Sequence, residues 1–233
     1  GFNNINVDLM SAIPGQTEAT LENTFDKVMA LQPEHISVYS LILEDGTYLA
    51  DNIDKFPPVP DEDEDRRMYH MTKERLHSAG YERYEISNYS RKGFECRHNL
   101  LYWNRGEYYS FGCSAAGFIG NERYSDIRDV KKYIELNGDI EKLHENIEIL
   151  TKEDAIEEFM FLGLRKMAGV DVMDFQRRFG VPIENVYVKE IEHNIDKGLL
   201  IRQGDMLKLT EYGIDICNTC LLYTSPSPRD STS

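Results

Sequence analysis

Cysteine is scarce in this sequence, and long apolar runs are absent. The 233 residues include only four cysteines, Cys96, Cys113, Cys217 and Cys220, which are too few and too scattered for a disulfide framework. The Cys217-x-x-Cys220 pair has no second pair beside it, so it does not complete a four-ligand zinc site. No apolar run approaches the roughly 18 residues of a membrane span. We therefore expect a soluble protein of the reducing cytoplasm, for which peripheral membrane contact stays open.

Positive charge is also in short supply. Lys and Arg number 26 against 41 Asp and Glu, which gives a net charge of −15. Such a balance repels phosphate backbones and argues against nucleic acid as a partner. The 41% hydrophobic and 29% charged residues are ordinary for a globular protein, and the length suits one large domain or a medium and a small one.

Both ends of the sequence predict a fragment. The chain begins at Gly1, without an initiator Met or a leader, and enters a strand pattern at once, as it would after an internal cut. From Cys220 the amphipathic pattern stops. Residues 220–233, rich in Ser, Thr and Pro, resemble translated adapter sequence more than a native tail, so we expect this tail to be non-native.

The first part of the chain has the order of a βαβ unit. Residues 5–10 alternate and predict a strand, residues 18–31 predict a helix capped by Thr17, and residues 35–43 predict a buried strand. Strands joined in this order pair in parallel through a right-handed crossover.

Further elements follow in the same part. The acidic run at residues 61–65 is explained best as the first turn of a helix that ends at Gly80, because the helix macrodipole favours acids there. Residues 81–87 and 108–119 predict two more strands.

The pattern changes character at residue 125. Residues 126–136 predict a helix, and the segment that follows, up to residue 150, reads as a turn and a linker. Residues 151–219 predict three helices, the first capped by Thr151, and then a hairpin around Gly204. Three helices followed by a hairpin is the order of a winged helix.

Asp8 is an acid inside a strand that otherwise suits burial. Unpaired acids are costly to bury, and Asp is depleted in strands. Because ligands of parallel sheets bind at the carboxyl ends of the strands, this carboxylate could accept hydrogen bonds from ribose hydroxyls. An Asp that caps its own turn is an equal alternative on position alone.

A second cluster combines an imidazole, an amide, a phenol and the only indole of the chain within six residues: His98, Asn99, Tyr102 and Trp103. Imidazole nitrogen is a good ligand for haem iron, and flat aromatic rings stack on a porphyrin. A lone His more often has a structural role. On residue type alone, a structural role for His98 is therefore favoured over a role as haem ligand.

Taken in order, these segments resemble the radical S-adenosylmethionine enzymes of the coproporphyrinogen-oxidase-like family, over about residues 1–218. The resemblance is carried by Asn-Ile-Asn-Val-Asp-Leu-Met at 4–10, Ile-Pro-Gly-Gln-Thr at 13–17 and His-Ile-Ser-Val-Tyr-Ser-Leu at 35–41. Tyr-Glu-Ile-Ser-Asn-Tyr at 84–89 and His-Asn-Leu-Leu-Tyr-Trp at 98–103 are similar to the HemW-type branch, described as haem chaperones.

The resemblance implies a fold and a division of the chain. The fold is α/β: the C-terminal part of a radical-SAM partial (β/α) barrel, followed by a small winged-helix-like domain. The barrel part and its extension would cover residues 1–124, a linking helix and linker 125–150, and the C-terminal domain 151–219.

The resemblance also implies site residues. Asp8 would bind the ribose of S-adenosylmethionine, with Met10 and Ile42 near the adenine. The residues that would contact haem are His98, Asn99, Tyr102 and Trp103, with His98 as the candidate iron ligand. No catalytic residue is implied within this chain.

One part of the family pattern is missing. The Cys-x-x-x-Cys-x-x-Cys motif that holds the [4Fe–4S] cluster is absent, since none of the four cysteines has that spacing. We therefore expect no radical chemistry from this chain alone.

Three functions compete for the whole protein. The leading prediction is haem binding and delivery to haem-requiring acceptor proteins. The alternative is an oxygen-independent coproporphyrinogen III oxidase, which would be an enzyme. A DNA-binding regulator is disfavoured, because acids such as Glu153 and Glu157 offset the few basic residues of the winged-helix segment.

Overall fold

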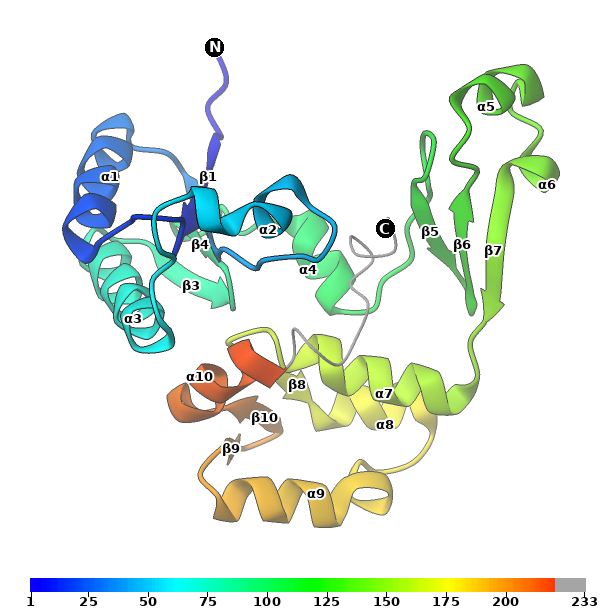
Figure 1. Ribbon diagram of the computed structural model, residues 1–233. Helices are drawn as coiled ribbons and strands as arrows, with labels where there is room; N and C mark the ends of the chain where they lie inside the picture. Colours follow the sequence, from blue (N-terminus) through cyan, green and yellow to red (C-terminus); the bar gives the residue numbers. More distant parts are fainter. Residues whose placement is uncertain (221–233) are drawn as a thin grey trace. The chain divides into compact units, whose positions relative to one another are not determined.

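The computed structural model describes residues 1–220, with side chains up to residue 215, and contains two compact units (Figure 1). The first unit is Gly1–Cys96, and the second unit begins at Arg97. The predicted non-native tail from residue 221 on, and the side chains of Cys217 and Cys220, lie outside the described residues.

The first unit is a four-stranded sheet in the order β1-β2-β4-β3 with helices on one face. Its elements are β1 (Asn6–Ser11), α1 (Glu18–Leu31), β2 (His35–Ser40), α2 (Tyr48–Asp51), the 3-10 helix η1 (Ile53–Lys55), α3 (Glu62–Ser78), β3 (Glu82–Glu85) and β4 (Asn88–Ser90). Strands β1 and β2 pair in parallel, which confirms the predicted βαβ unit.

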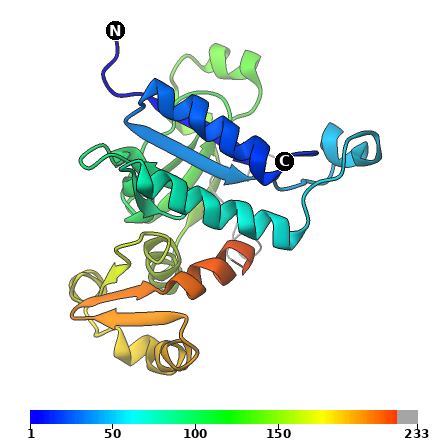
Figure 2. The same ribbon diagram turned by 90° about the vertical axis from the view of Figure 1, so that its left-hand side faces the viewer.

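Local capping places both long helices of this unit. Thr17 caps α1 by accepting a hydrogen bond from the backbone N–H of Thr20 at 3.3 Å, and Asp61 caps α3 through the N–H of Glu64 at 2.8 Å. Figure 2 shows α1 and α3 side by side over one face of the sheet. The core of the unit lies between these layers, and its fully buried members include Leu21, Phe25, Ile36, Met68 and Leu76.

The strand predicted at 81–87 is present as β3, but it ends at Glu85, before the predicted end, and a second strand follows it. Residues 82–90 form two strands, β3 and β4, and β4 pairs antiparallel with both β3 and β2. The carboxylate of Glu85 accepts hydrogen bonds from the backbone N–H of Ser87 at 3.0 Å and from the side chain of Asn88, and this closes the turn between the strands. Among the described strands of this sheet, only β1 and β2 are parallel.

The second unit begins with α4 (Arg97–Trp103), which the sequence did not predict as a helix. The other elements are β5 (Ala116–Ile119), β6 (Glu122–Asp126), α5 (Val130–Leu136), α6 (Ile140–Leu143), β7 (His144–Ile149), α7 (Lys152–Gly163), β8 (Val170–Asp171), α8 (Val172–Phe179), α9 (Glu184–Asp196), β9 (Leu200–Gln203), β10 (Met206–Leu209) and α10 (Glu211–Cys220).

Three predicted elements of the second unit are corrected. The strand expected over 108–119 is limited to β5 and one bridge of Tyr108, because Gly112 and Ser114 have positive φ, at 107° and 60°. The helix expected from residue 126 begins only at Val130, since Asp126 ends β6. The expected linker contains α6 and then β7, which pairs antiparallel with β6.

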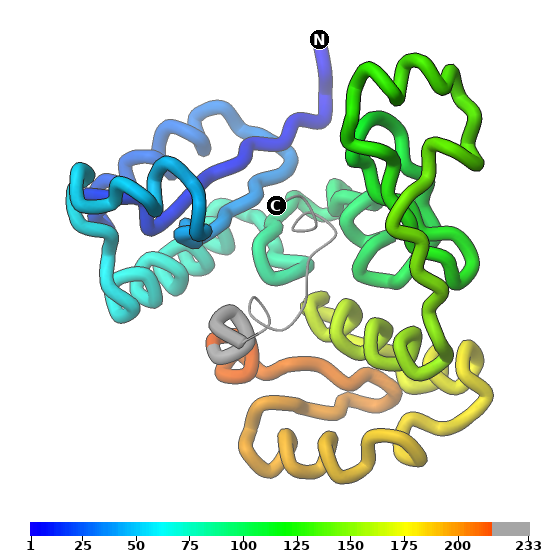
Figure 3. Tube along the Cα trace, turned by 45° about the vertical axis from the view of Figure 1, so that its right-hand side comes forward, coloured from blue at the N-terminus to red at the C-terminus, as the bar shows by residue number. Residues whose placement is uncertain are grey.

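The C-terminal part has the predicted three helices and hairpin, and adds a strand. Figure 3 follows the chain from α7 through α8 and α9 into β9 and β10. The short strand β8 pairs with β10, so the sheet order is β8-β10-β9. Its core is formed by side chains such as Phe159, Phe175, Ile183 and Leu207. Nowhere in residues 1–220 is there a helix both long and apolar enough to cross a membrane.

Candidate functional site

The first sheet has one polar face. In the register of β1 and β2, Asn6 lies opposite His35 and Asp8 opposite Ser37. Because side chains alternate along a strand, these four share a face, and the neighbours on the other face, such as Ile36, belong to the core under the helices. On this polar face the side chains of Asn6 and Asp8 are exposed, whereas those of His35 and Ser37 are buried.

Hydrogen bonds connect the polar face into one chain that ends at Asp8. The buried ring of His35 has Nδ1 at 2.6 Å from Asn6 Oδ1 and Nε2 at 2.8 Å from the hydroxyl of Tyr84. Asn6 Nδ2 donates to Asp8 Oδ1 at 2.7 Å, and the Tyr84 hydroxyl accepts from the backbone N–H of Cys96 at 3.3 Å. Because the amide oxygen of Asn6 can only accept, Nδ1 of His35 carries the proton in this hydrogen bond. Each donor in the chain therefore bonds to the group that is one step nearer to Asp8.

Asp8, Met10 and Ile42 lie toward the carboxyl end of the parallel pair. Asp8 bonds to Asn6, in its own strand, rather than to the turn that follows. Met10 is 52% exposed and Ile42 49%. The backbone N–H of Leu41 donates to Ser11 O at 2.9 Å, which keeps the segment before Ile42 beside β1. The structure thus places an exposed carboxylate and two exposed apolar side chains toward the carboxyl end of this strand pair.

The pKa of His35 is lowered by its burial, against the opposing charge of Asp8. A folded-state pKa below that of the unfolded chain means that the unfolded state binds more protons between the two values. The stability that His35 contributes is therefore complete above the unfolded pKa of about 6.5 and is lost as pH falls through it toward the folded value.

We accordingly expect His35→Gln to flatten the pH dependence of unfolding. Below about pH 6.5 the unchanged protein should lose up to about 1.4 kcal/mol per pH unit more than the variant. Urea denaturation between pH 5 and 8 measures this difference. His77→Gln is the control, because the side chain of His77 is 69% exposed. Parallel pH profiles for the unchanged protein and His35→Gln would contradict the assignment.

Helix α4 carries the four aromatic and polar residues singled out in the sequence, on two faces. His98 and Tyr102 are four residues apart and make an edge-on ring contact with centroids 4.7 Å apart. Tyr102 in turn contacts Tyr108 at 4.4 Å, so the exposed imidazole is the outer end of a row of rings.

The other face of α4 carries Asn99 and Trp103, and Trp103 contacts Arg165. Asn99 and Trp103 are also four residues apart, and the guanidinium of Arg165 lies over the indole of Trp103 at 4.5 Å. The structure therefore brings His98 and Tyr102 together, and places Trp103 against the end of α7.

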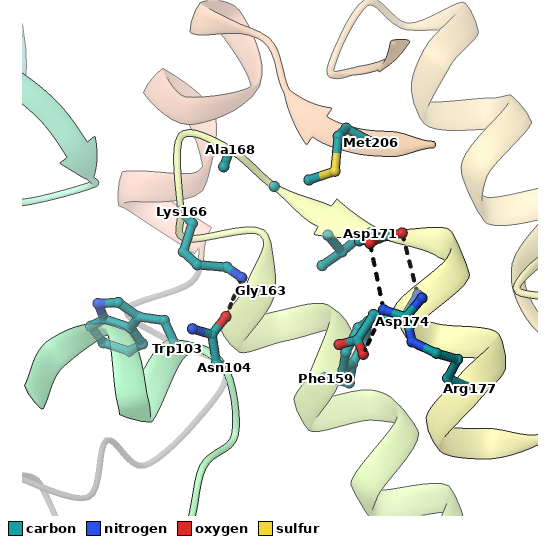
Figure 4. Close-up of a pocket in the computed structure, with 12 residues that line it drawn as sticks. Trp103, Asn104, Phe159, Gly163, Lys166, Ala168, Asp171, Asp174, Arg177 and Met206 are labelled. Carbon is teal, nitrogen blue, oxygen red and sulfur yellow. Dashed lines mark hydrogen bonds and ion pairs between the residues drawn. The ribbon is translucent and has the colours of Figure 1, made fainter. Parts of the chain in front are cut away.

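A cavity of about 180 Å³ lies beside Trp103 in the second unit (Figure 4). Its charged lining is largely self-paired, since Arg177 reaches Asp174 at 3.2 Å and Asp171 at 3.8 Å. Pockets that enclose drug-sized ligands measure about 300–1,000 Å³. The cavity is too small to enclose a porphyrin.

Sequence reasoning missed His35, Tyr84 and Arg165. His35 and Tyr84 are the first residues of two segments that carry the family resemblance, but an isolated His or Tyr gave no sign of its partner. Arg165 counted only as one of the few basic residues of the winged-helix segment. Each acquires its role through a contact far along the chain, for instance His35 with Tyr84 over 49 residues.

Comparison with known proteins supports the predicted resemblance. Residues 150–216 match the family model of the HemN C-terminal domain. The chain is 36% identical to the heme chaperone HemW of Lactococcus lactis, over 94% of this chain and 57% of that protein. HemW of Bacillus subtilis is 36% identical over 91% of this chain and 56% of its own, and HemW of Escherichia coli 28% over 95% and 57%. The chain thus spans little more than half the length of these relatives.

A solved structure shows the same fold. The radical SAM enzyme coproporphyrinogen III oxidase (HemN) from Escherichia coli aligns with a TM-score of 0.76 at 16% identity, over 95% of this chain and 55% of that one. The predicted fold class, a radical-SAM α/β part followed by a C-terminal domain, is confirmed.

Proposed function

We propose that this chain, as part of a protein of the coproporphyrinogen-oxidase-like radical S-adenosylmethionine family, binds haem on α4, and that the whole protein delivers the haem to haem-requiring acceptor proteins. The observation that carries the proposal is the exposed imidazole of His98, braced by the ring of Tyr102 at 4.7 Å. The similarity to HemW heme chaperones over more than nine-tenths of the chain supports it.

The chemistry of haem suits a single protein ligand. Residues 1–215 contain no group of three or more His, Cys, Asp or Glu that could hold a bare metal ion. Haem brings four ring nitrogens of its own, so one axial imidazole is enough to attach its iron. The row of rings from His98 through Tyr102 to Tyr108 adds flat aromatic surface beside that ligand.

S-adenosylmethionine is the second ligand in this proposal. Asp8 would accept hydrogen bonds from the ribose hydroxyls, and Met10 and Ile42 would border the adenine. Asn6 and His35 hold the Asp8 carboxylate through the chain of hydrogen bonds described above. In the whole protein, the [4Fe–4S] cluster would be held by cysteines that this chain does not have, and it would supply the electron for any radical step.

A haem titration tests the proposal. We expect His98→Ala to weaken haem affinity about tenfold or more, which is about 1.4 kcal/mol, and to shift the Soret band, because the imidazole that would ligate the iron is removed. Tyr102→Leu should have a smaller effect in the same direction, because only the ring support is lost.

The control is another exposed helical histidine of the second unit. His193 lies on α9. His193→Ala should leave haem affinity and the Soret band unchanged. If His98→Ala and Tyr102→Leu together bind haem as tightly as the unchanged chain, the proposed site on α4 is wrong.

A further inference from the structure

Basic side chains gather at the C-terminal end of α4. They come from the turn after α7 and from α8, all within the second unit. Helix α4 has only seven residues. An isolated helix this short is marginal in water, because few of its hydrogen bonds offset the cost of its first turn. The direction of α4 must therefore be fixed by contacts outside the helix.

Three contacts hold this end. Lys166 Nζ donates to Asn104 Oδ1 at 2.5 Å, as Figure 4 shows, and Arg178 Nη1 donates to the backbone oxygen of Asn104 at 3.0 Å. One residue earlier, the guanidinium of Arg165 covers the indole of Trp103 at 4.5 Å. Together they attach the end of α4 to the turn after α7 and to α8.

These contacts match what a helix end needs. The backbone N–H groups of Arg105 and Gly106 donate to the carbonyls of Tyr102 and Leu101 at 2.9 and 2.8 Å. Arg178 supplies a donor for the carbonyl of Asn104, and positive charge is favourable beside a helix C-terminus. A guanidinium over an indole adds a directional attraction of about 0.5–2 kcal/mol. Burial and the neighbouring Arg178 lower the pKa of Lys166, yet its ammonium stays directed at Asn104.

We propose that Arg165, Lys166 and Arg178 are positioning residues for haem binding: they fix the last turn of α4 and so the direction of the His98 ring. In this view Trp103 is an anchor of the helix rather than a surface for haem. The inference rests on the proposed role of His98, but its structural part can be measured without haem.

Amide hydrogen exchange in the absence of haem tests the structural part. In Arg165→Ala and in Arg178→Ala, protection of the backbone amides of residues 101–106 should fall about tenfold or more, as for a loss of about 1.4 kcal/mol of local stability. Arg165→Lys keeps a cation over the indole and should restore much of the protection.

Arg177→Ala is the matched control. Arg177 is the neighbour of Arg178 on α8, and its contacts are ion pairs with Asp171 and Asp174 rather than with Asn104. It should leave exchange in α4 unchanged. Equal exchange in the Arg177 and Arg178 variants would overturn the inference.

The haem spectrum tests the positioning itself. Arg178→Ala should weaken haem affinity several-fold and change the Soret band, although the unit still melts cooperatively near its original temperature. If exchange rises but the spectrum and affinity of bound haem stay the same, the three residues stabilise α4 without positioning His98. If the unchanged chain binds no haem, the proposed function fails, and hydrogen exchange alone then decides whether the anchor exists.

Discussion

Replacing Phe175 by Ala should lower the free energy of unfolding of the C-terminal part by about 3–5 kcal/mol. The Phe175 side chain has no exposed surface, and its ring lies between Phe159 at 5.6 Å and Phe179 at 4.9 Å. Its removal leaves a cavity where α7 meets α8, and the rigid neighbours fill this only in part. Urea denaturation followed by circular dichroism measures the change.

Met173→Ala is the control for this experiment. Met173 lies on the same helix, two residues before Phe175, and is 44% exposed. Both substitutions place Ala on α8, so they share the same change in helix propensity to within a few tenths of a kcal/mol. The Met173 variant should lose no more than about 1 kcal/mol. A similar loss from both variants would mean that the Phe175 ring does not organise this core.

The sequence was most informative where a few neighbouring residues decide the structure. Thr17 and Thr151 cap their helices as predicted, because each interaction involves a side chain and a backbone N–H only three residues away. Asp61, predicted within the first turn of its helix, is the N-cap instead. The hairpin of β9 and β10 around Gly204 is equally local.

Prediction was poorest where distant partners decide. Strand β7 lies in the segment predicted as a linker, and its side chains Ile147 and Ile149 are more than half exposed. It is a strand because its backbone pairs with β6. Likewise, the side chains that contact the end of α4 at Trp103 and Asn104 come from Arg165 and Lys166, about sixty positions later.

The same difference between local and distant partners applies to the residues of the candidate site. Asp8 and His98 could be found in the sequence because their chemistry is unusual for a strand or suits a known cofactor. The residues that hold them, such as His35 beside Asn6, are ordinary in type, and the chain brings them together across 29 positions. A single sequence shows which side chains can do chemistry more readily than which ones orient them.

Gly169→Ala should destabilise the C-terminal part by about 2–5 kcal/mol. Gly169 has φ +78°, a conformation that a side chain disfavours, and it directly precedes β8. A Cβ at this position would lie 2.2 Å from the backbone oxygen of Leu207 and 2.6 Å from Cβ of Lys208. Both atoms belong to β10, so the added methyl can be accommodated only by separating β8 from β10.

The Gly180→Ala variant separates the cost of backbone strain from the cost of the steric clash. Gly180 has nearly the same backbone conformation, φ +75°, but an added Cβ meets nothing within 4 Å. This variant should lose only the conformational strain, about 1–2 kcal/mol. The difference between the two variants, measured by urea denaturation, is then the steric cost of the β8–β10 contact. Equal losses would show that β8 moves away from β10 freely, and that the third strand contributes little to the stability of the C-terminal fold.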